Sequence, residues 1–489
     1  MKNKKKIIII INIIIILFTC SLITKKLQND TFFTIATAKN VFTSGFDDLD
    51  HLTWHDNLNF IKVRWAFDIL IYLIYSFFDF RGIYIFVLII ASLTSSILFN
   101  ILLKKNNNFF ISLLLTILSI YFCTKLRGFT ARAQVISFLL LLIEIYTIEK
   151  LIETNNKIYT FILFVISVLI ANFHASVWLM TEILMLPYLV DIVLGKFIKK
   201  HSHIILNYHS NIKLLVITIF IIAIGGLCNP NGLITYTYIY KNINGLSPTF
   251  IIELQKLAIT DSYYVLGLLT IYLGILIFTN TKVKLSDILL FLGLTLMMTM
   301  ARRNQIYFYL IAVIPFSRLI CNFIDDNIKL KKIFSFINSN LTKPLYSLIV
   351  VLILIAISIN NLEHRVREEY ISVSDYPVDI TNYIKENIDV SSLRIFNHFN
   401  FGSYLEFNDI PAFIDSRSEI FCQEFNDTQI LKDWLDATRG NKNYQIIFDK
   451  YDINYALLYN AELINLYIYN DPNYKLIYQD DIFCLYKKI

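Results

Sequence analysis

The stretch IIIIINIIIILFTCSL, residues 7–22, is the first apolar run of this chain and follows a short lysine-rich N-terminus. Asp30, the first acidic residue, comes shortly after the run. A helix needs about 20 residues to cross a bilayer, so we expect residues 7–23 to form a membrane span that ends before Asp30. A signal peptide has a similar shape, but residues 21–30 are bulky and charged and contain no small-residue cleavage site. We therefore expect an uncleaved span with the lysines on the inside.

Composition places the chain among membrane proteins. Its residues are 56% hydrophobic and its mean hydropathy is +0.56, which excludes an ordinary soluble chain. Residues 361–489 contain 12 Lys or Arg and 21 Asp or Glu, a net charge of −9. The whole chain contains 44 and 38, so residues 1–360 contain 32 and 17, a net charge of +15. We predict a basic membrane domain at 1–360 and an acidic extracytoplasmic domain at 361–489.

Apolar runs recur along the membrane domain, and about eleven have the composition of a span. They are residues 7–23, 83–103, 109–122, 135–148, 158–171, 176–194, 212–227, 263–278, 285–300, 306–319 and 345–359.

The placement of lysines between these runs predicts the topology. Residues 65–78 are apolar but short, and they contain Asp68. If this segment lies on the outer face instead of spanning, the lysine-rich loops all fall on the inside, as the positive-inside rule requires. We therefore predict a cytoplasmic N-terminus, a first outer loop at 24–82 that contains a surface helix at 65–78, and an extracytoplasmic C-terminal domain.

Several basic residues are exceptions to this rule, because the predicted topology places them at the outer ends of spans. They are Arg64, Arg127, Arg132, Arg302 and Arg303. One interpretation is that these side chains reach the lipid headgroups. The other is that they bind the phosphate of a lipid, for which arginine offers a planar fork of donors.

Further polar residues, including Asn172, His174 and Asn229, lie at span ends on the same side. A single such residue is usually a cap, but together they indicate a site. The six cysteines have no metal-ligand spacing. Nucleic acid is excluded as a partner, because the water-exposed domain is acidic.

Local patterns predict the remaining elements. In the first outer loop, apolar residues at helical spacing after Asp30 predict an amphipathic helix on the outer leaflet. The C-terminal domain has the pattern of a small α/β fold. We predict helices at 370–388, 428–437 and 444–451 and strands at 394–399, 403–407, 412–414, 455–458, 475–478 and 482–486. Asp415 and Arg417, in Asp-Ser-Arg after a strand, are its most site-like residues.

The order of these motifs resembles the GT-C superfamily of polytopic glycosyltransferases, and more closely a group of uncharacterised bacterial GT-C-like membrane proteins. The resemblance covers nearly the whole chain. The motifs that carry it are Asp30-Thr-Phe-Phe-Thr-Ile-Ala-Thr-Ala-Lys, Asp50-His-Leu-Thr-Trp-His, Trp65-Ala-Phe-Asp-Ile-Leu, Ala131-Arg-Ala-Gln, Asn172-Phe-His, Asn229-Pro-Asn-Gly, Arg302-Arg303 and Asp415-Ser-Arg417. The chain departs from the family at Arg64, where an acidic residue is common, and at Ala133, where proline is common.

The resemblance implies an α-helical polytopic membrane protein that transfers sugar from a polyprenyl-phosphate-linked donor to an acceptor that the sequence does not name. Asp30 would act as the acid/base and Asp50 would assist it. The donor phosphate would be bound by Arg127, Arg132, His174, Arg302 and Arg303. The resemblance leaves the participation of a divalent metal open.

Two other classes of function fit the same composition. A flippase or transporter of a lipid-linked saccharide would place ionisable residues inside the spans; the interiors of the predicted spans are almost free of charge, with Glu144 and Glu182 as exceptions. A non-catalytic envelope assembly protein would concentrate its charges in the C-terminal domain.

Overall fold

A computed structural model describes residues 2–198, 203–207, 210–258, 262–341 and 343–489. The chain divides into two compact units. The helical unit comprises Met1–Thr24, Tyr84–Gly232 and Ile251–Glu368, and the mixed unit comprises Lys25–Ile83, Leu233–Phe250 and Glu369–Ile489. We had predicted that the first outer loop belongs to the membrane domain. The compact units instead assign it to the same unit as the C-terminal residues.

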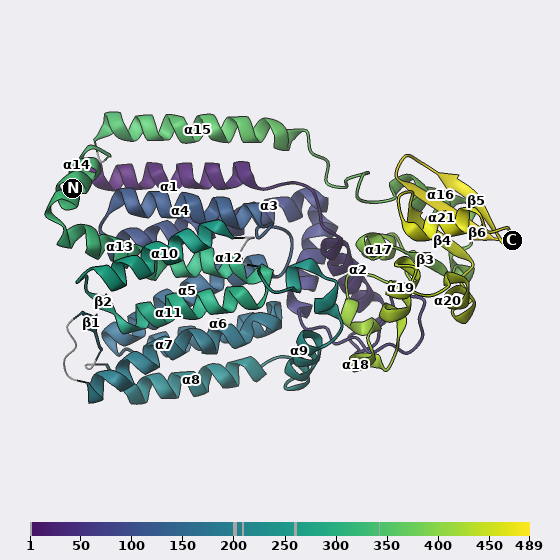
Figure 1. The fold of residues 1–489 in the computed structure, drawn as a ribbon, viewed down its shortest axis with the longest axis horizontal. Helices are drawn as coiled ribbons and strands as arrows, with labels where there is room; N and C mark the ends of the chain where they lie inside the picture. The colour runs from purple at the N-terminus through teal and green to yellow at the C-terminus, as the bar shows by residue number, and fades with distance from the viewer. Residues whose placement is uncertain (1, 199–202, 208–209, 259–261, 342) are drawn as a thin grey trace. The chain divides into compact units, whose positions relative to one another are not determined.

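Long apolar helices make up the helical unit and lie side by side in Figure 1. The helices are α1 (Lys2–Leu22), the later part of α3 (Trp65–Asn106), α4 (Phe109–Lys125), α5 (Gln134–Thr154), α6 (Ile158–Phe173), α7 (Trp178–Phe197), α8 (Ile212–Leu227), α10 (Tyr263–Phe278), α11 (Leu285–Met300), α12 (Gln305–Tyr307), the π-helix η6 (Phe308–Ala312), α13 (Val313–Asp326), α14 (Ile328–Leu341) and α15 (Pro344–Val366). Each of the predicted apolar runs is helical. In the described part of the chain, four helices are long and apolar enough to cross a membrane and six more are apolar but shorter.

Helix α3 contains the boundary predicted near residue 78. Asp79 has φ 55° and ψ −161°, which interrupts the helix after the 65–78 segment. A non-glycine residue in this conformation is uncommon and marks a sharp break in the helix. The segment at 65–78 is therefore a helix of its own, as predicted. Its position on the membrane surface stays a prediction.

Polar and charged contacts connect the apolar helices of the helical unit. Asn12 of α1 accepts hydrogen bonds from Ser96 Oγ at 2.7 Å and from Asn100 Nδ2 at 3.0 Å, both on α3. Arg318 of α13 donates to Asp287 Oδ1 at 2.7 Å and also to Glu149. Buried charges need such partners, so these contacts help to fix the order in which the helices pack.

The mixed unit contains a four-stranded sheet in the order β3-β4-β6-β5. Strands β3 (Ile395–Asn397) and β4 (Tyr455–Tyr459) are parallel, whereas β6 (Phe483–Lys488) is antiparallel to β4 and to β5 (Tyr474–Gln479). Its helices are α2 (Asn29–Ser44), α9 (Ile234–Asn244), α16 (Val378–Asn387), α17 (Gly402–Phe407), α18 (Gln423–Asn426), α19 (Ile430–Thr438), α20 (Tyr444–Lys450) and α21 (Leu463–Tyr469). The predicted strands at 394–399, 455–458, 475–478 and 482–486 are confirmed with small shifts of their ends.

Two predicted strands of this unit are wrong. Residues 403–407 form helix α17, in which Tyr404 and Phe407 lie 5.1 and 5.3 Å from the Phe32 ring of α2. This packing overrides a short apolar pattern that cannot by itself distinguish helix from strand. Residues 412–414 form one isolated bridge, from Ala412 to Thr53. Asn397 Oδ1 accepts a hydrogen bond from Phe413 N at 2.7 Å, and Asn397 Nδ2 donates to Ile414 O at 2.8 Å. These side-chain bonds replace the backbone bonds that a neighbouring strand would make.

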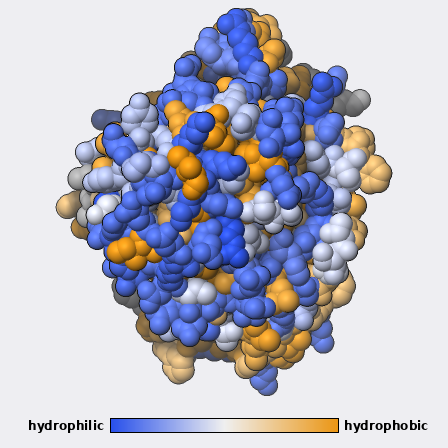
Figure 2. Space-filling model, turned by 90° about the vertical axis from the view of Figure 1, so that its right-hand side faces the viewer, coloured by the Kyte–Doolittle hydropathy of each residue, from blue (hydrophilic) through white to orange (hydrophobic). Residues whose placement is uncertain are grey.

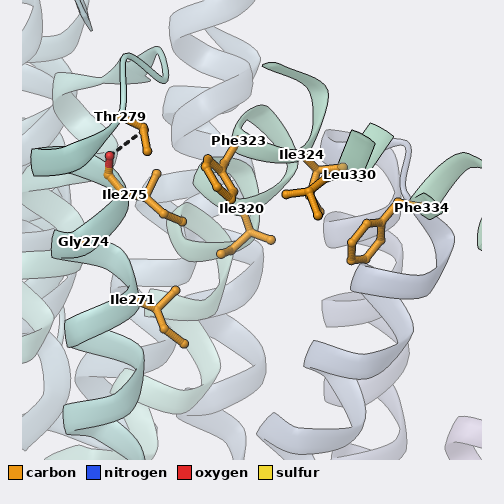
Figure 3. Close-up of a pocket in the computed structure, with 9 residues that line it drawn as sticks. All are labelled: Ile271, Gly274, Ile275, Thr279, Ile320, Phe323, Ile324, Leu330 and Phe334. Atoms are coloured by element: carbon orange, nitrogen blue, oxygen red, sulfur yellow. Dashed lines mark hydrogen bonds between the residues drawn. The ribbon is translucent and has the colours of Figure 1, made fainter. Parts of the chain in front are cut away.

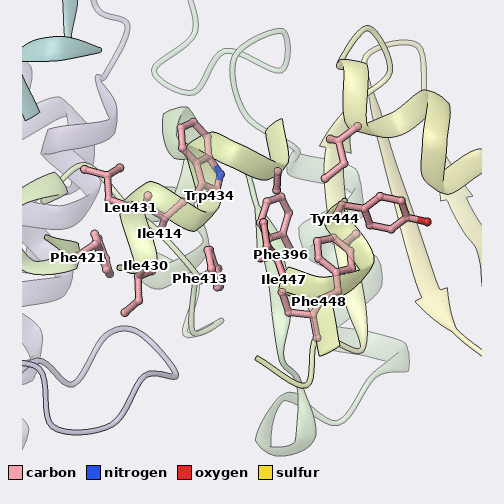
Figure 4. Close-up of a cluster of buried hydrophobic side chains, with 14 of the residues drawn as sticks. Phe396, Phe413, Ile414, Phe421, Ile430, Leu431, Trp434, Tyr444, Ile447 and Phe448 are labelled. Atoms are coloured by element: carbon pink, nitrogen blue, oxygen red, sulfur yellow. The ribbon is translucent and has the colours of Figure 1, made fainter. Parts of the chain in front are cut away.

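Helix α2 differs from the predicted amphipathic helix on the leaflet. Eight consecutive residues, 31–38, are buried, so every face of this stretch is covered by protein. Phe33 of α2 and Leu58 and Phe60 of the first outer loop belong to the same hydrophobic core as the sheet and its helices. Figure 4 shows part of this core, in which Phe396, Phe413 and Phe448 pack together. The first outer loop is therefore part of the fold of the mixed unit.

The surface of the molecule viewed in Figure 2 is mostly hydrophilic, with scattered hydrophobic residues. By contrast, helices of the helical unit expose large apolar side chains such as Phe161, Phe220 and Leu296, as spans that face lipid do. Cys422 and Cys484 are both buried and do not form a disulfide with each other.

A buried acid of the mixed unit gives a testable pH dependence. Burial raises the pKa of Glu462 to about 8 and lowers the pKa of His398, 3.6 Å away, to about 4. Because the folded-state pKa of Glu462 is raised, its contribution to stability is present below its unfolded pKa and is lost as the pH rises through about 8.

We therefore expect Glu462→Gln to stabilise the mixed unit at pH 8 by roughly 1–3 kcal/mol, the cost of burying an unsatisfied polar group. The gain should be absent at pH 4.5. Urea unfolding followed by proteolysis measures both values, with the exposed Glu386→Gln as control. An equal effect of Glu462→Gln at the two pH values would contradict the assignment.

Candidate functional site

A buried guanidinium lies at the centre of the mixed unit. The Arg417 side chain is 2% exposed and contacts three carboxyl groups. Its Nη1 donates to Asp50 Oδ1 at 2.5 Å, and its Nη2 donates to Asp415 Oδ2 at 2.5 Å and Glu406 Oε1 at 3.1 Å. Its Nε donates to both oxygens of Asp415, at 3.0 and 3.1 Å. We call these four residues the Arg417 cluster.

Local structure positions each member of the cluster. Asp50 lies in a turn where its side chain accepts bonds from Leu52 N at 3.3 Å and from Thr53 N and Oγ1 at 3.2 and 2.6 Å. Glu406 is carried by α17, which begins at Gly402. A Cβ on residue 402 would lie 1.9 Å from the carbonyl oxygen of Ile414. Only glycine therefore allows α17 to approach the segment that carries Asp415 and Arg417.

The cluster holds three acids against one arginine, and its protonation follows from burial. Burial raises the pKa of Asp50, but the Arg417 guanidinium outweighs it and holds this pKa below its ordinary value. Burial and the neighbouring Asp415 raise the pKa of Glu406 well above its ordinary range. Burial therefore favours the neutral form of Glu406, whereas Arg417 favours the ionised form of Asp50.

Two aromatic rings cover the guanidinium. The Arg417 Cζ lies 4.7 Å from the ring centre of Phe60 and 5.3 Å from that of Phe33. These contacts connect the cluster to the first outer loop and to α2. Arg64, in the same unit, lies 4.2 Å over the Phe33 ring and pairs with Asp68 at 3.3 Å.

Three sequence-predicted residues, Asp50, Asp415 and Arg417, thus meet in one cluster. Both oxygens of Asp50 accept hydrogen bonds, and the residue is 8% exposed. This is the geometry of a buried ion pair. Glu406 was missed because 403–407 was predicted as a strand; its only sequence signal is an acid within an otherwise apolar segment.

Asp30 lies in the first turn of α2. The helix N-cap is Gln28, so Asp30 is not the capping residue. Asp30 is partly buried, and its neighbour Asn29 donates from Nδ2 to the Phe399 carbonyl at 3.1 Å. This hydrogen bond attaches the first turn of α2, which carries Asp30, to the C-terminal segment of the same unit.

In the helical unit, three segments that carry or adjoin the predicted arginines lie together. Arg132 donates to Glu253 Oε2 at 3.1 Å. The amide of Arg302 donates to Gln255 O at 2.9 Å. Gly128, next to Arg127, is so close to Ile306 that a Cβ there would lie 3.1 Å from it. We call the part of the helical unit formed by residues 127–134, 251–257 and 301–306 the arginine end.

The remaining predicted site residues of the helical unit each make a different kind of contact. His174 Nδ1 lies 2.7 Å from Ser137 Oγ in the first turn of α5, close in sequence to Arg132. Arg303 interacts electrostatically with Tyr307. Asn172 donates to Cys228 O at 2.7 Å, and Asn229 donates to Gly226 O at 2.9 Å. These two asparagines bond to backbone carbonyls, as residues that stabilise helix ends do.

Among the described residues, no group of three or more His, Cys, Asp or Glu side chains is arranged to hold a metal ion.

A matched pair of substitutions tests the protonation of the Arg417 cluster. Arg417→Leu leaves Asp50 and Asp415 buried without their cation, so we expect a loss of roughly 3–5 kcal/mol in the stability of the mixed unit. Glu406→Gln replaces a neutral acid by an amide of the same shape, so we expect a loss under about 1 kcal/mol. Pulse proteolysis in urea measures both. Equal losses, or a larger loss for Glu406→Gln, would show that Glu406 is ionised.

No model of a known protein family matches the chain, and no curated protein matches its sequence. Its structure is similar to the crystal structure of an oligosaccharyltransferase from Archaeoglobus fulgidus, tethered through a disulfide bond to an acceptor peptide with the NVT sequon. The TM-score is 0.57 at 9% identity, over 92% of this chain and 68% of the archaeal chain. At this identity the likeness establishes the fold. The chain thus has a fold similar to that of the archaeal oligosaccharyltransferase, with several apolar helices typical of membrane proteins and a small C-terminal α/β region.

Proposed function

We propose that this protein is a glycosyltransferase that uses a polyprenyl-phosphate-linked sugar donor at the outer membrane face. The observation that carries the proposal is the arginine end of the helical unit. There, the segments 127–134 and 301–306, which carry Arg127, Arg132, Arg302 and Arg303, lie together within a largely apolar unit. The fold, shared with an archaeal oligosaccharyltransferase, supports the same class of reaction.

The arginines and His174 are proposed to bind the phosphate of the donor. Phosphate becomes the leaving group when the sugar is transferred, so its negative charge increases in the transition state. Fixed guanidinium groups stabilise that charge more than they stabilise the ground state, which lowers the barrier. Arg132 is paired with Glu253 at 3.1 Å, and the proposal is that the donor phosphate takes the place of this carboxylate.

Asp30 is proposed to act as the acid/base on the acceptor hydroxyl. Its place in the first turn of α2, a helix whose residues 31–38 are buried, supports this role by fixing the position of the carboxylate. Asp50, which we first expected to assist in catalysis, is proposed here as a positioning residue. It holds the first outer loop to Arg417, and Arg417 in turn contacts Phe33 of α2, three residues from Asp30.

A second candidate function is a flippase or transporter of a lipid-linked saccharide. One observation favours it. Glu144 is 1% exposed within α5, and neither of its carboxyl oxygens has a hydrogen-bond partner among the described residues. Ionisable residues inside spans commonly mark transport paths. A transporter would move the lipid-linked sugar without breaking its glycosidic bond, so the two functions differ in whether free polyprenyl phosphate is formed.

The test is Asp30→Asn, which keeps the size and polarity of the side chain but removes its basicity. We expect transfer to fall by roughly 10²-fold or more, because a positioned base contributes about 10²–10⁴-fold. Full-length protein in lipid nanodiscs would be given a panel of synthetic polyprenyl-phosphate sugars, and the release of polyprenyl phosphate would be followed by mass spectrometry.

The control is Asp56→Asn, at an exposed acid of the same loop, which should keep the wild-type rate. A fully active Asp30→Asn protein would refute the role of Asp30. A wild-type protein that moves sugar lipids across the bilayer without releasing polyprenyl phosphate would favour the transporter.

A further inference from the structure

An apolar cavity of about 200 Å³ lies inside the helical unit. Helices α4, α10, α11, the π-helix η6 and α13 line it, with aromatic and aliphatic side chains for most of its wall. The polar groups among the lining residues are the hydroxyls of Ser119, Tyr264 and Tyr309. A cavity with such walls favours a hydrocarbon ligand over water or a sugar.

The cavity lies toward the arginine end. Along α10 it is lined by Tyr264 and Leu268, near the start of the helix, and along α13 by Val313, at its first residue. The chain enters α13 from Arg302–Asn304 through α12 and η6. Tyr309 therefore lies only six residues after Arg303, or about 9 Å along a helix.

A second groove gives the contrast. It has a volume of about 460 Å³ and is lined by residues from the later parts of α10 and α13, such as Ile275 and Ile324, and by Leu330 of α14 (Figure 3). It lies at the opposite ends of the same two helices, next to the lysines of α14. The two cavities are both apolar, but only the first adjoins the arginines.

A ring stack connects the two arginine-bearing segments at the cavity wall. Phe122 lies near the end of α4, five residues before Arg127, and Tyr309 lies six residues after Arg303. The two rings stack at 4.9 Å with an interplanar angle of 17°. The cavity is therefore built on the same two segments that carry Arg127 and Arg303.

The wall also contains an uncommon backbone element. Residues Phe308–Ala312 form a π-helix, all of them buried. Such turns are rare and occur often at functional sites, because they widen the helix and displace its side chains. Here the wide turn contributes Phe308, Tyr309 and Ala312 to the cavity.

We propose that this cavity binds the phosphate-proximal isoprene units of a polyprenyl phosphate, while the phosphate lies at the arginine end. The inference rests on the proposed function and assigns its donor-tail site to named residues. A branched, fully apolar chain next to a phosphate matches an apolar cavity next to arginines. Burial of that chain in the cavity, away from water, would increase the affinity for the lipid without any contact to the sugar.

Photolabelling of the full-length protein tests the site directly. The probe is a polyprenyl phosphate with a diazirine on an isoprene unit near the phosphate. In nanodiscs we expect its crosslinks on η6 and α4, around Tyr309 and Ser119. Excess unlabelled polyprenyl phosphate should abolish them, whereas an equal excess of phosphatidic acid should not. Crosslinks mainly along the groove of Figure 3, or equal competition by phosphatidic acid, would overturn the proposal.

Cavity-filling variants provide a second measurement. Ser119→Leu and Ala312→Leu place extra carbon atoms in the cavity, and we expect each to weaken binding of the probe tenfold or more. Gly274→Leu is the matched control in the other groove, where a Cβ meets no atom within 4 Å, and it should bind as wild type. If a filling variant fails to fold, the crosslink map of the wild-type protein still decides.

The outcomes separate this inference from the proposed function. Specific crosslinks at the cavity with no transfer from any donor would retain the lipid site and refute the transferase. Transfer that Ser119→Leu and Ala312→Leu leave unchanged, with crosslinks elsewhere, would retain the transferase and refute the cavity as its tail site.

Discussion

The burial of the Arg417 guanidinium is the constraint on which the mixed unit depends. A buried cation is tolerated only when carboxylates and hydrogen bonds replace water around it. Here those partners come from separate stretches of the chain: Asp50 from the first outer loop, Glu406 from α17, and Asp415 from the segment of Arg417 itself. If one ionised partner is removed, a charge is left buried without its counter-charge. The stretches of chain that carry these residues must therefore fold together.

The cluster also fixes the surroundings of Asp30. Arg417 packs on Phe33, and Asn29 bonds to the carbonyl of Phe399, so α2 is attached to the C-terminal region on both sides of its first turn. A carboxylate on a loose loop would be a poor base, because its position relative to the acceptor would vary. Residues 31–38 of α2, which are buried on all faces, give this carboxylate a rigid support.

The helical unit follows a different constraint. Its apolar helices satisfy their own backbone, as a bilayer requires, and several of its charges are paired, as Arg318 is with Asp287. An apolar cavity and a set of guanidinium groups on the same segments suit a ligand with a hydrocarbon tail and a phosphate. This combination is the reason that we propose a lipid-linked donor rather than a soluble nucleotide sugar.

Much of the fold could be predicted from the sequence, because hydropathy and length alone identify apolar helices. The long-range organisation could not. Arg417 and Asp50 are separated by 367 positions, and no local pattern shows that they meet. Helix α2 was predicted to be amphipathic because the residues that cover its second face lie far away in the sequence of the same chain. Glu406 was not predicted as a site residue because 403–407 was predicted as a strand. Tertiary packing decides between helix and strand in this segment. Asp50, Asp415 and Arg417 were each predicted as site residues, but not as one cluster.

Native-state hydrogen exchange in increasing urea tests the central claim most directly, namely that the first outer loop and the C-terminal region are one folding unit. The amides of α2 and of β4 would be compared in the full-length protein in nanodiscs. The account predicts that, as the urea concentration rises, the amides of α2 and of β4 come to exchange through one unfolding reaction with one free energy. The reason is that the Arg417 cluster joins the segments that carry them. Exchange of α2 through a separate opening of lower free energy, with β4 still protected, would contradict it.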